Sequence, residues 1–161
     1  MTRRKRTLSI SITVLVVVLI VFAGIRGYRY AKQEWCCINL CSLVSCIHVY
    51  MNGYNETYPT PQQWCDLIKD EAKAPEDTFK CPGAKEGPCS YAMNKNVSAY
   101  KYGTAPGDLV FIFESKPGWN QVGGSELLTT EYHEGRGCHI MYANLTVVFV
   151  KKEDLASLRW K

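Results

Sequence analysis

The feature that most constrains the fold of this chain is the uncharged stretch TLSISITVLVVVLIVFAGI at residues 7–25. The hydrocarbon core of a bilayer is about 30 Å thick, and a helix that rises about 1.5 Å per residue spans it with about 20 apolar residues. The few hydroxyl side chains of the stretch, including Ser9 and Thr13, can donate hydrogen bonds to carbonyls of the same helix. We therefore expect residues 7–25 to form a transmembrane helix with the lipid bilayer as its partner.

Basic residues on either side of this stretch set its expected orientation. Residues 1–6 form a flank with four basic side chains, whereas the three basic side chains of residues 26–34 are opposed by Glu34. Basic flanks tend to stay in the cytoplasm, so we expect a single-pass protein with a cytoplasmic amino terminus. A cleaved secretory signal is the alternative, because it also has a basic start and an apolar middle. The sequence FAGIR at residues 22–26 is a poor cleavage site and favours a retained signal anchor.

The helical pattern continues past the apolar stretch and becomes one-sided. Residues 26–52 contain no proline, and apolar or semi-polar residues recur at spacings of three and four, which indicates an amphipathic continuation of the same helix. The expected inner stripe is Cys37, Leu40, Cys41, Val44, Ile47, His48 and Met51. Asn52 and Gly53 then provide a helix stop.

Residues 53–161 have room for one small globular head. Their patterns predict a short helix at 61–72 capped by Thr60, an ordered loop at 75–105, a strand at 108–113, a loop at 115–125, a hairpin of strands 139–143 and 146–150, and a helical tail from residue 151. A long helix followed by a few strands predicts an α+β fold, in which the helix packs against a small antiparallel sheet. The net charge of +4 comes mainly from the first six residues and the other basic residues are scattered, so we expect no nucleic-acid partner.

Eight cysteines are many for 161 residues, and the expected topology places most of them in an oxidising compartment. The disulfide candidates are Cys81 with Cys89 and Cys65 with Cys138. The cysteines of the predicted helix are expected to be buried thiols. A zinc site is the alternative there, although its spacing matches no common zinc motif. Its ligands would be Cys37, Cys41, Cys46 and His48.

Several stretches between residues 31 and 150 resemble, in order, the type IV prepilin-like and type II secretion pseudopilin-like proteins that carry a processing-associated domain marked by a His, about nine residues and Asp-Gly. The matching positions are Cys37, Asn39, Leu40, Cys81, Pro82, Glu114, Trp119, Asn120, Gly123, Gly124, His133, Gly137, Cys138 and Asn144. The resemblance implies a pilin-like α+β fold, anchoring in the inner membrane with the head in the periplasm, and contact with other pilin-like subunits or secretion machinery.

The chain departs from that family at two motifs. The family begins with a Gly-Phe-Thr-Leu-x-Glu-like site that a peptidase cuts after the Gly, but Lys5 and Arg6 replace the Gly and Phe here and Ile10 stands near the Glu. The Asp-Gly of the hairpin is replaced by residues around Asn144. These departures put processing and filament assembly in question, so an unprocessed, membrane-tethered binding domain is the alternative function.

A thiol- or metal-dependent exported enzyme is the remaining alternative. His133, Cys138 and His139 lie close in sequence and resemble a thiol nucleophile with its base, but spacing alone provides neither an orienting group nor an oxyanion site. Glu114, Glu131 and Glu134 could bind calcium, although they lack the Asp-rich pattern of calcium loops. We therefore expect a non-catalytic structural or assembly protein, with no cofactor other than a possible calcium ion and with no evident small-molecule substrate.

Overall fold

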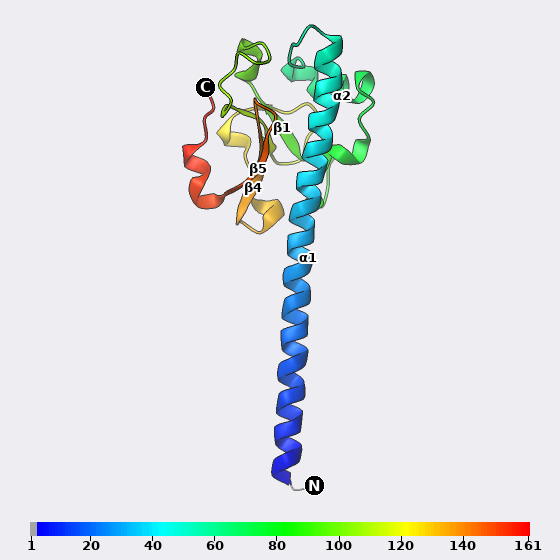
Figure 1. The fold of residues 1–161 in the computed structure, drawn as a ribbon, viewed down its shortest axis with the longest axis vertical. Helices are drawn as coiled ribbons and strands as arrows, with labels where there is room; N and C mark the ends of the chain where they lie inside the picture. The colour runs from blue at the N-terminus through cyan, green and yellow to red at the C-terminus, as the bar shows by residue number, and fades with distance from the viewer. Residues whose placement is uncertain (1–2) are drawn as a thin grey trace. The chain divides into compact units, whose positions relative to one another are not determined.

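The computed structural model describes the backbone of residues 3–161 and the side chains of residues 12–161. The helices are α1 (Arg3–Gly53) and α2 (Trp64–Glu71), and the strands are β1 (Tyr91–Asn94), β2 (Val110–Glu114), β3 (Val122–Gly123), β4 (Gly137–Tyr142) and β5 (Val147–Lys151). The short 3₁₀ helices are η1 (Pro61–Gln63), η2 (Glu76–Phe79), η3 (Val97–Ala99), η4 (Ser125–Leu127), η5 (Glu131–His133) and η6 (Lys152–Ser157). The chain divides into two compact units, of which the first ends at Lys32 and the second, here called the head, is Gln33–Lys161 (Figure 1).

The first unit is the amino-terminal part of α1. Its apolar side chains between Ile12 and Ile25 are exposed, and none of the most apolar part of the helix is buried within the protein. In the described part of the chain, α1 is the one helix long and apolar enough to cross a membrane. At its end, the Nζ atom of Lys32 lies 4.8 Å from the centre of the Tyr28 ring. The helix therefore has the length and composition of a membrane anchor.

The helix face that packs into the head differs from the predicted stripe. The buried residues, spaced by three and four, are Cys36, Leu40, Leu43, Ile47 and Tyr50, with Met51 beside them. Of the predicted stripe, Cys37 is only half-buried and Cys41 and His48 are exposed, so that part of the prediction is wrong. Apolar residues on both sides of the helix obscured the true face, because Trp35 and Ile38 are exposed at 59% and 51%.

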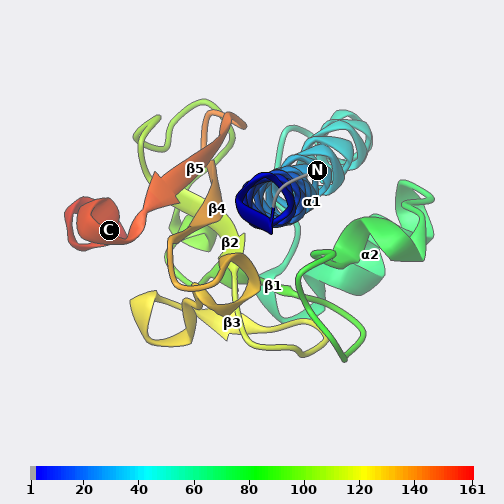
Figure 2. The same ribbon diagram turned by 90° about the horizontal axis from the view of Figure 1, so that it is seen from below.

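The five strands form one sheet in the order β3-β1-β2-β4-β5. The β2·β4 and β4·β5 pairs are antiparallel, in agreement with the predicted antiparallel sheet. The unpredicted β1 pairs antiparallel with β2 and parallel with β3, so the sheet is mixed. The long helix packed against this small sheet confirms the predicted α+β class. The part of α1 that belongs to the head, residues 33–53, is here called the head helix. It lies against one face of the sheet (Figure 2).

The two faces of the sheet are covered by different clusters. Side chains from the head part of α1, from α2 and from alternate strand positions such as Phe111 and Met141 form the larger core. A smaller cluster on the other face contains Phe113 and Cys138, against which the carboxy-terminal Leu158 and Trp160 pack. The carboxy terminus lies on the side of the sheet away from α1 (Figure 2).

Local predictions succeed where the sequence pattern is strong. The predicted hairpin is present with slightly shifted strands, and Leu145 in its turn adopts a positive φ of 64°. The predicted helix at 61–72 corresponds to η1 and α2, although Thr60 makes no side-chain capping bond to η1. The predicted loops at 75–105 and 115–125 contain the unpredicted strands β1 and β3, respectively. The tail forms the 3₁₀ helix η6.

Candidate functional site

The carboxylate of Glu114 is the centre of a buried polar cluster between α1 and the sheet. Glu114 is the last residue of β2 and is fully buried. Its Oε1 atom accepts a hydrogen bond from Cys36 Sγ at 2.6 Å and lies 2.8 Å from His133 Nε2. Its Oε2 atom accepts a bond from the backbone N–H of His139 at 3.0 Å. One carboxylate thus connects α1, η5 and β4.

Two further groups border this carboxylate. The Cys36 sulfur lies 3.4 Å from the hydroxyl of Tyr91, the residue that pairs with Glu114 across β1 and β2. Cys81 Sγ lies 3.8 Å from His133 Nε2 and also interacts with Cys36. All five side chains are buried. The cluster therefore combines a carboxylate, an imidazole, a phenol and two thiols away from bulk water.

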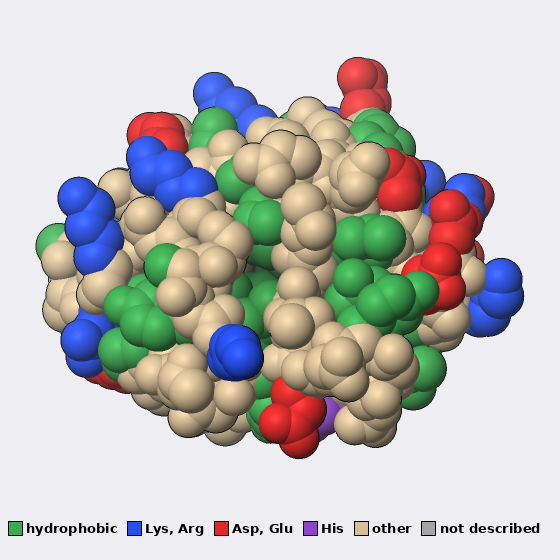
Figure 3. Space-filling view, turned by 90° about the horizontal axis from the view of Figure 1, so that it is seen from above, with side chains coloured by type: hydrophobic (Ala, Val, Ile, Leu, Met, Phe, Trp, Pro, Cys, Tyr) green, Lys and Arg blue, Asp and Glu red, His purple; other side chains and the backbone are tan. Residues whose placement is uncertain are grey.

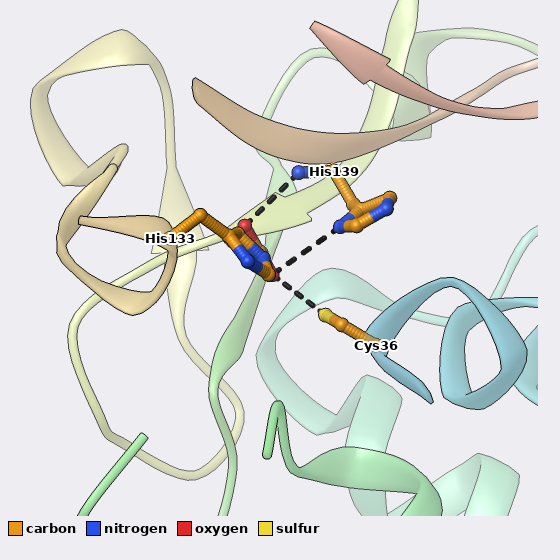
Figure 4. A group of neighbouring side chains, drawn as sticks. Cys36, His133 and His139 are labelled. Carbon is orange, nitrogen blue, oxygen red and sulfur yellow. Dashed lines mark hydrogen bonds and ion pairs between the residues drawn. The ribbon is translucent and has the colours of Figure 1, made fainter. Parts of the chain in front are cut away.

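His139 completes the cluster from β4. Its Nδ1 atom lies 3.7 Å from Glu114 Oε1, too far for a hydrogen bond, and within the described residues this buried nitrogen has no hydrogen-bond partner. The rings of His133 and His139 lie edge to face with centres 5.1 Å apart. Figure 4 shows Cys36, His133 and His139 pointing toward a common point from three different elements.

Hydrogen bonding decides the charges in this cluster. Burial opposes ionisation of Glu114, but the hydrogen bond from His133, the nearby His139 ring, whose Nδ1 atom lies at 3.7 Å, and the bond from Cys36 lower its pKa to about 2. Burial also opposes protonation of His133, yet its contacts with Cys81 and Glu114 raise its pKa to about 9. The two therefore form a buried ion pair at neutral pH.

The pKa values of the two thiols, Cys36 and Cys81, shift in opposite directions. Burial, the contact with Cys81 and the neighbouring Glu114 carboxylate raise the pKa of Cys36, which remains a thiol and donates to Glu114. The pKa of Cys81 is lowered, first by its hydrogen bond with Cys36 and then, against burial, by His133.

Local geometry explains how these residues come together. The turn after η5 is formed by Glu134 and Gly135, which both adopt positive φ, and it holds His133 over the sheet. Gly83 lets the loop that carries Cys81 approach η5, because a Cβ atom at that position would lie 2.3 Å from the carbonyl oxygen of Tyr132.

The predicted nucleophile and base do not meet. Neighbouring residues of a strand point to opposite faces, so His139 faces α1 whereas Cys138 faces the other cluster, with Phe113 and Ile140. Burial, and to a lesser extent Glu114, raises the pKa of Cys138, which makes its thiol a poor nucleophile. His133 instead contacts Glu114 and Cys81.

The residues of the two predicted ion sites do not lie together. Of the three acidic residues considered for calcium, Glu114 lies in the buried cluster with Cys36, His133 and His139, whereas Glu131 and Glu134 are exposed. The zinc set proposed along the helix is not gathered, because Cys41 and His48 are exposed whereas Cys46 is partly buried against the core.

The cysteines differ from the predicted pairs. All eight lie in the described part of the chain and are free thiols. Cys89 Sγ lies 3.9 Å from Cys65 Sγ rather than next to Cys81, which faces the Glu114 cluster. Cys65 and Cys138 belong to cores on opposite faces of the sheet, so that predicted bridge is wrong.

Other residues of the family pattern hold the loops of the head in place. Trp119 Nε1 donates to Asp66 Oδ1 at 2.6 Å, and the Asn120 side chain bonds to Asp66 and to the backbone N–H of Cys65. Asn39 Nδ2 donates to the carbonyl oxygens of Asp77 and Lys80, at 3.2 and 2.6 Å. Further positions of the pattern also lie in turns, strands or the core: Leu40, Pro82, Gly123, Gly124, Gly137 and Asn144.

The sequence prediction treated Cys36 only as one of the buried thiols of the helix, which is confirmed for Cys36 and wrong for the exposed Cys41, and it misassigned His139. The predicted strand began at His139, whereas β4 begins at Gly137, and alternation along the longer strand separates Cys138 from His139. Glu114 directly follows the predicted apolar strand, and no local pattern distinguishes it from an exposed carboxylate at a strand end. No protein-family model, curated protein or solved structure matches the chain.

Proposed function

We propose that this protein is a membrane-anchored, non-catalytic pilin-like structural or assembly component whose head faces the periplasm. The observation that carries the proposal is the length of α1. This single helix runs from Arg3 to Gly53 and contains both an exposed apolar segment and the inner face of the head core. An element with these two parts suits a protein that is held in a membrane and presents a head outside it.

The outer surface of the head helix supports a role in assembly. Trp35, Ile38 and Val49 are exposed at 59%, 51% and 57% and lie on the side of α1 away from its buried face. With Ser42 and Ser45 between them, they follow the three- and four-residue spacing of one helix face. Aromatic and aliphatic side chains next to small ones are suited to packing against another helix.

The head has another exposed surface that is suited to contacts. Figure 3 shows this face from above, with basic and acidic side chains spread around its rim and hydrophobic side chains exposed in its middle. An open hollow of about 540 Å³ is lined by residues of 57–62 and 98–101, including Tyr58 and Tyr100. A mixed surface of this kind is compatible with binding a protein partner.

Membrane anchoring is tested by charge insertion. Replacing Val17 and Leu19 together by Arg should release the protein from membranes, because each Arg near a helix centre costs about 2.5–3.5 kcal/mol of insertion free energy. Resistance of the protein to carbonate extraction is the measurement. Val49→Arg places a single such charge at an exposed apolar position of the head and should leave the protein in the membrane. A wild-type protein that carbonate removes from membranes would refute the anchor.

Orientation and assembly need separate measurements. Protease added to spheroplasts should digest the head, and its protection there would refute the periplasmic location. Trp35→Ala and Ile38→Ala should reduce chemical cross-linking between copies or to secretion components, while Glu131→Ala, an exposed change elsewhere, should not. Equal cross-linking of all three variants and the wild type would exclude the outer helix face as an assembly surface.

The second candidate is an unprocessed, membrane-tethered binding domain. It is favoured by Lys5 and Arg6, which replace the residues of the peptidase site, and by Ile10 near the position of the family's Glu. Mass spectrometry of the mature amino terminus separates the two functions. Cleavage near residue 6 would favour filament entry, whereas an intact amino terminus would favour retention in the membrane as a binding domain.

A further inference from the structure

We propose that Cys36, Glu114, His133 and His139 form a closed binding site in the head for a divalent metal ion of the zinc type. One ligand atom from each of these residues lies within 4.8 Å of the others, and all four residues are buried. They come from α1, β2, η5 and β4, so the fold itself brings them together from distant parts of the sequence. The site is distinct from the surfaces proposed for anchoring and assembly.

The donor atoms match the chemistry of zinc. Thiolate sulfur, imidazole nitrogen and carboxylate oxygen are its usual protein ligands, and four such ligands without an open position are typical of structural sites. Bonds of about 2.0–2.3 Å in a tetrahedral site separate neighbouring ligand atoms by about 3.3–3.8 Å. The 3.7 Å between His139 Nδ1 and Glu114 Oε1 already has this value.

Two other ligand distances need a small adjustment. Cys36 Sγ and His133 Nε2 lie 2.6 and 2.8 Å from Glu114 Oε1, which are hydrogen-bond lengths. When an ion replaces the protons in these bonds, the ligand atoms must separate by about 1 Å to reach the spacing of a tetrahedral site.

The charges balance in the metal-bound site. With Cys36 as a thiol, the Glu114–His133 ion pair has no net charge. A divalent ion bound to a thiolate, a carboxylate and two neutral imidazoles also gives a net charge of zero. The bound site therefore leaves no uncompensated charge in the buried cluster.

The unsatisfied nitrogen of His139 is an independent observation that points to a ligand. Buried polar atoms almost always have a hydrogen-bond partner, and an exception calls for an explanation. His139 Nδ1 faces Glu114 and within the described residues has no hydrogen-bond partner, although the residue is only 2% exposed. A metal ion between the two would satisfy this nitrogen.

Oxidation of the thiols is the competing fate of the cluster. Cys81 interacts with Cys36 and lies beside His133, so a disulfide between the two cysteines would remove the thiolate ligand. A bound ion would instead keep Cys36 coordinated and would fasten α1 to the sheet through its three other ligands. The ion would then stabilise the packing of the head.

The test uses the full chain purified in detergent. After incubation with zinc and gel filtration, the protein should retain about one zinc per chain by elemental analysis. Cobalt in place of zinc should give a thiolate-to-cobalt absorption band in the near ultraviolet. Cys36→Ser should abolish this band and lower zinc affinity by at least tenfold. Cys37→Ser, which changes the adjacent half-buried thiol, should keep both properties.

Further measurements keep the outcome decisive. Circular dichroism should show that Cys36→Ser remains folded, and His139→Ala provides a second variant that should lose zinc without loss of a thiol. Retention of less than a tenth of an equivalent of zinc by the reduced wild-type protein would overturn the proposal. So would zinc binding that neither variant weakens, or a native disulfide between Cys36 and Cys81 in peptide maps. None of these results bears on membrane anchoring, so the two proposals can fail separately.

Discussion

Replacing Glu114 by Gln removes the charge at the centre of the buried cluster while nearly preserving the shape of the side chain. The carboxylate accepts hydrogen bonds from Cys36 Sγ, His133 Nε2 and the backbone N–H of His139. An amide presents only one acceptor oxygen, and its NH₂ group would face a donor. His133, held protonated by this carboxylate, would then be a buried cation without its partner.

The magnitude follows from the loss of one member of a buried ion pair. Breaking such a pair from one side costs about 3–5 kcal/mol, because the remaining charge stays desolvated or must release its proton. Unfolding entropy of about 2.1 cal/mol/K per residue over the head, Gln33–Lys161, converts 1 kcal/mol into about 4 °C. We therefore expect the Tm of the head to fall by about 11–18 °C in Glu114→Gln.

The assay is thermal and urea unfolding of the full chain in detergent, with a chelator present so that the free energy of unfolding reports the protein's own contacts. All four tryptophans lie beyond residue 25, so their fluorescence reports the head. Glu131→Gln, an exposed carboxylate of η5, is the matched control and should change the free energy of unfolding by less than about 0.5 kcal/mol. A Glu114→Gln protein within about 1 kcal/mol of the wild type would refute the ion-pair reasoning.

Three further predictions concern other parts of the head. Hydrogen bonds from Trp119 and its neighbour lower the pKa of Asp66, so this contribution to stability is complete above the ordinary pKa of 3.8 and is lost as pH falls through the lowered value. The difference in unfolding free energy between wild type and Asp66→Asn should therefore shrink below about pH 3.8 in urea titrations. Oxidation should join Cys65 to Cys89, since their sulfurs lie 3.9 Å apart, and stabilise the head by about 3 kcal/mol, measured by peptide mapping and unfolding with and without reductant. Gly83→Ala should lower the free energy of unfolding by about 1–3 kcal/mol in the same urea assay, because the added methyl group meets a backbone carbonyl.

Each of these has its own control and contrary result. A difference in unfolding free energy between wild type and Asp66→Asn that stays constant from pH 7 to pH 2 would contradict the lowered pKa of Asp66 in the folded protein. Peptide maps that pair Cys65 with Cys138 would contradict the placement of these thiols. Gly53→Ala is the control for the glycine, because nothing lies within 4 Å of a Cβ atom there, and equal stabilities of the two alanine variants would contradict the close approach.

The sequence predicted the elements with strong periodicity and missed those defined by pairing. The long helix and the closing hairpin were recognisable because their apolar residues repeat over many positions. Strand β1 (Tyr91–Asn94) was missed, since Ala, Met and Asn have little preference for strands and only its neighbours place it in the sheet. The parallel β1·β3 pair joins two short segments far apart in the chain, so no local pattern could predict it.

The candidate site was predicted only in part for a similar reason. Glu114 and His133 were selected from the resemblance. Their contact, however, depends on how the segment between β3 and β4, which contains η5, packs over the sheet. Choosing Cys37 instead of Cys36 rotates the helix by about 100°, and apolar residues on both sides allowed either choice. The thiol pairs depend on tertiary packing, which sequence spacing does not report.

The exposed side of the head helix leads to a specific expectation about association between chains that keep their amino-terminal residues. Trp35 and Ile38 remain exposed although the buried face beside them is fully packed, so the head itself does not explain why they are apolar. In the pilin-like proposal they contact another helix, and that contact does not depend on removal of residues 1–6. If the replacements at Lys5 and Arg6 prevent processing, association would occur between anchored copies in the membrane plane. Cross-links between intact, uncleaved chains that disappear in Trp35→Ala would support this arrangement, whereas cross-links confined to cleaved chains would contradict it.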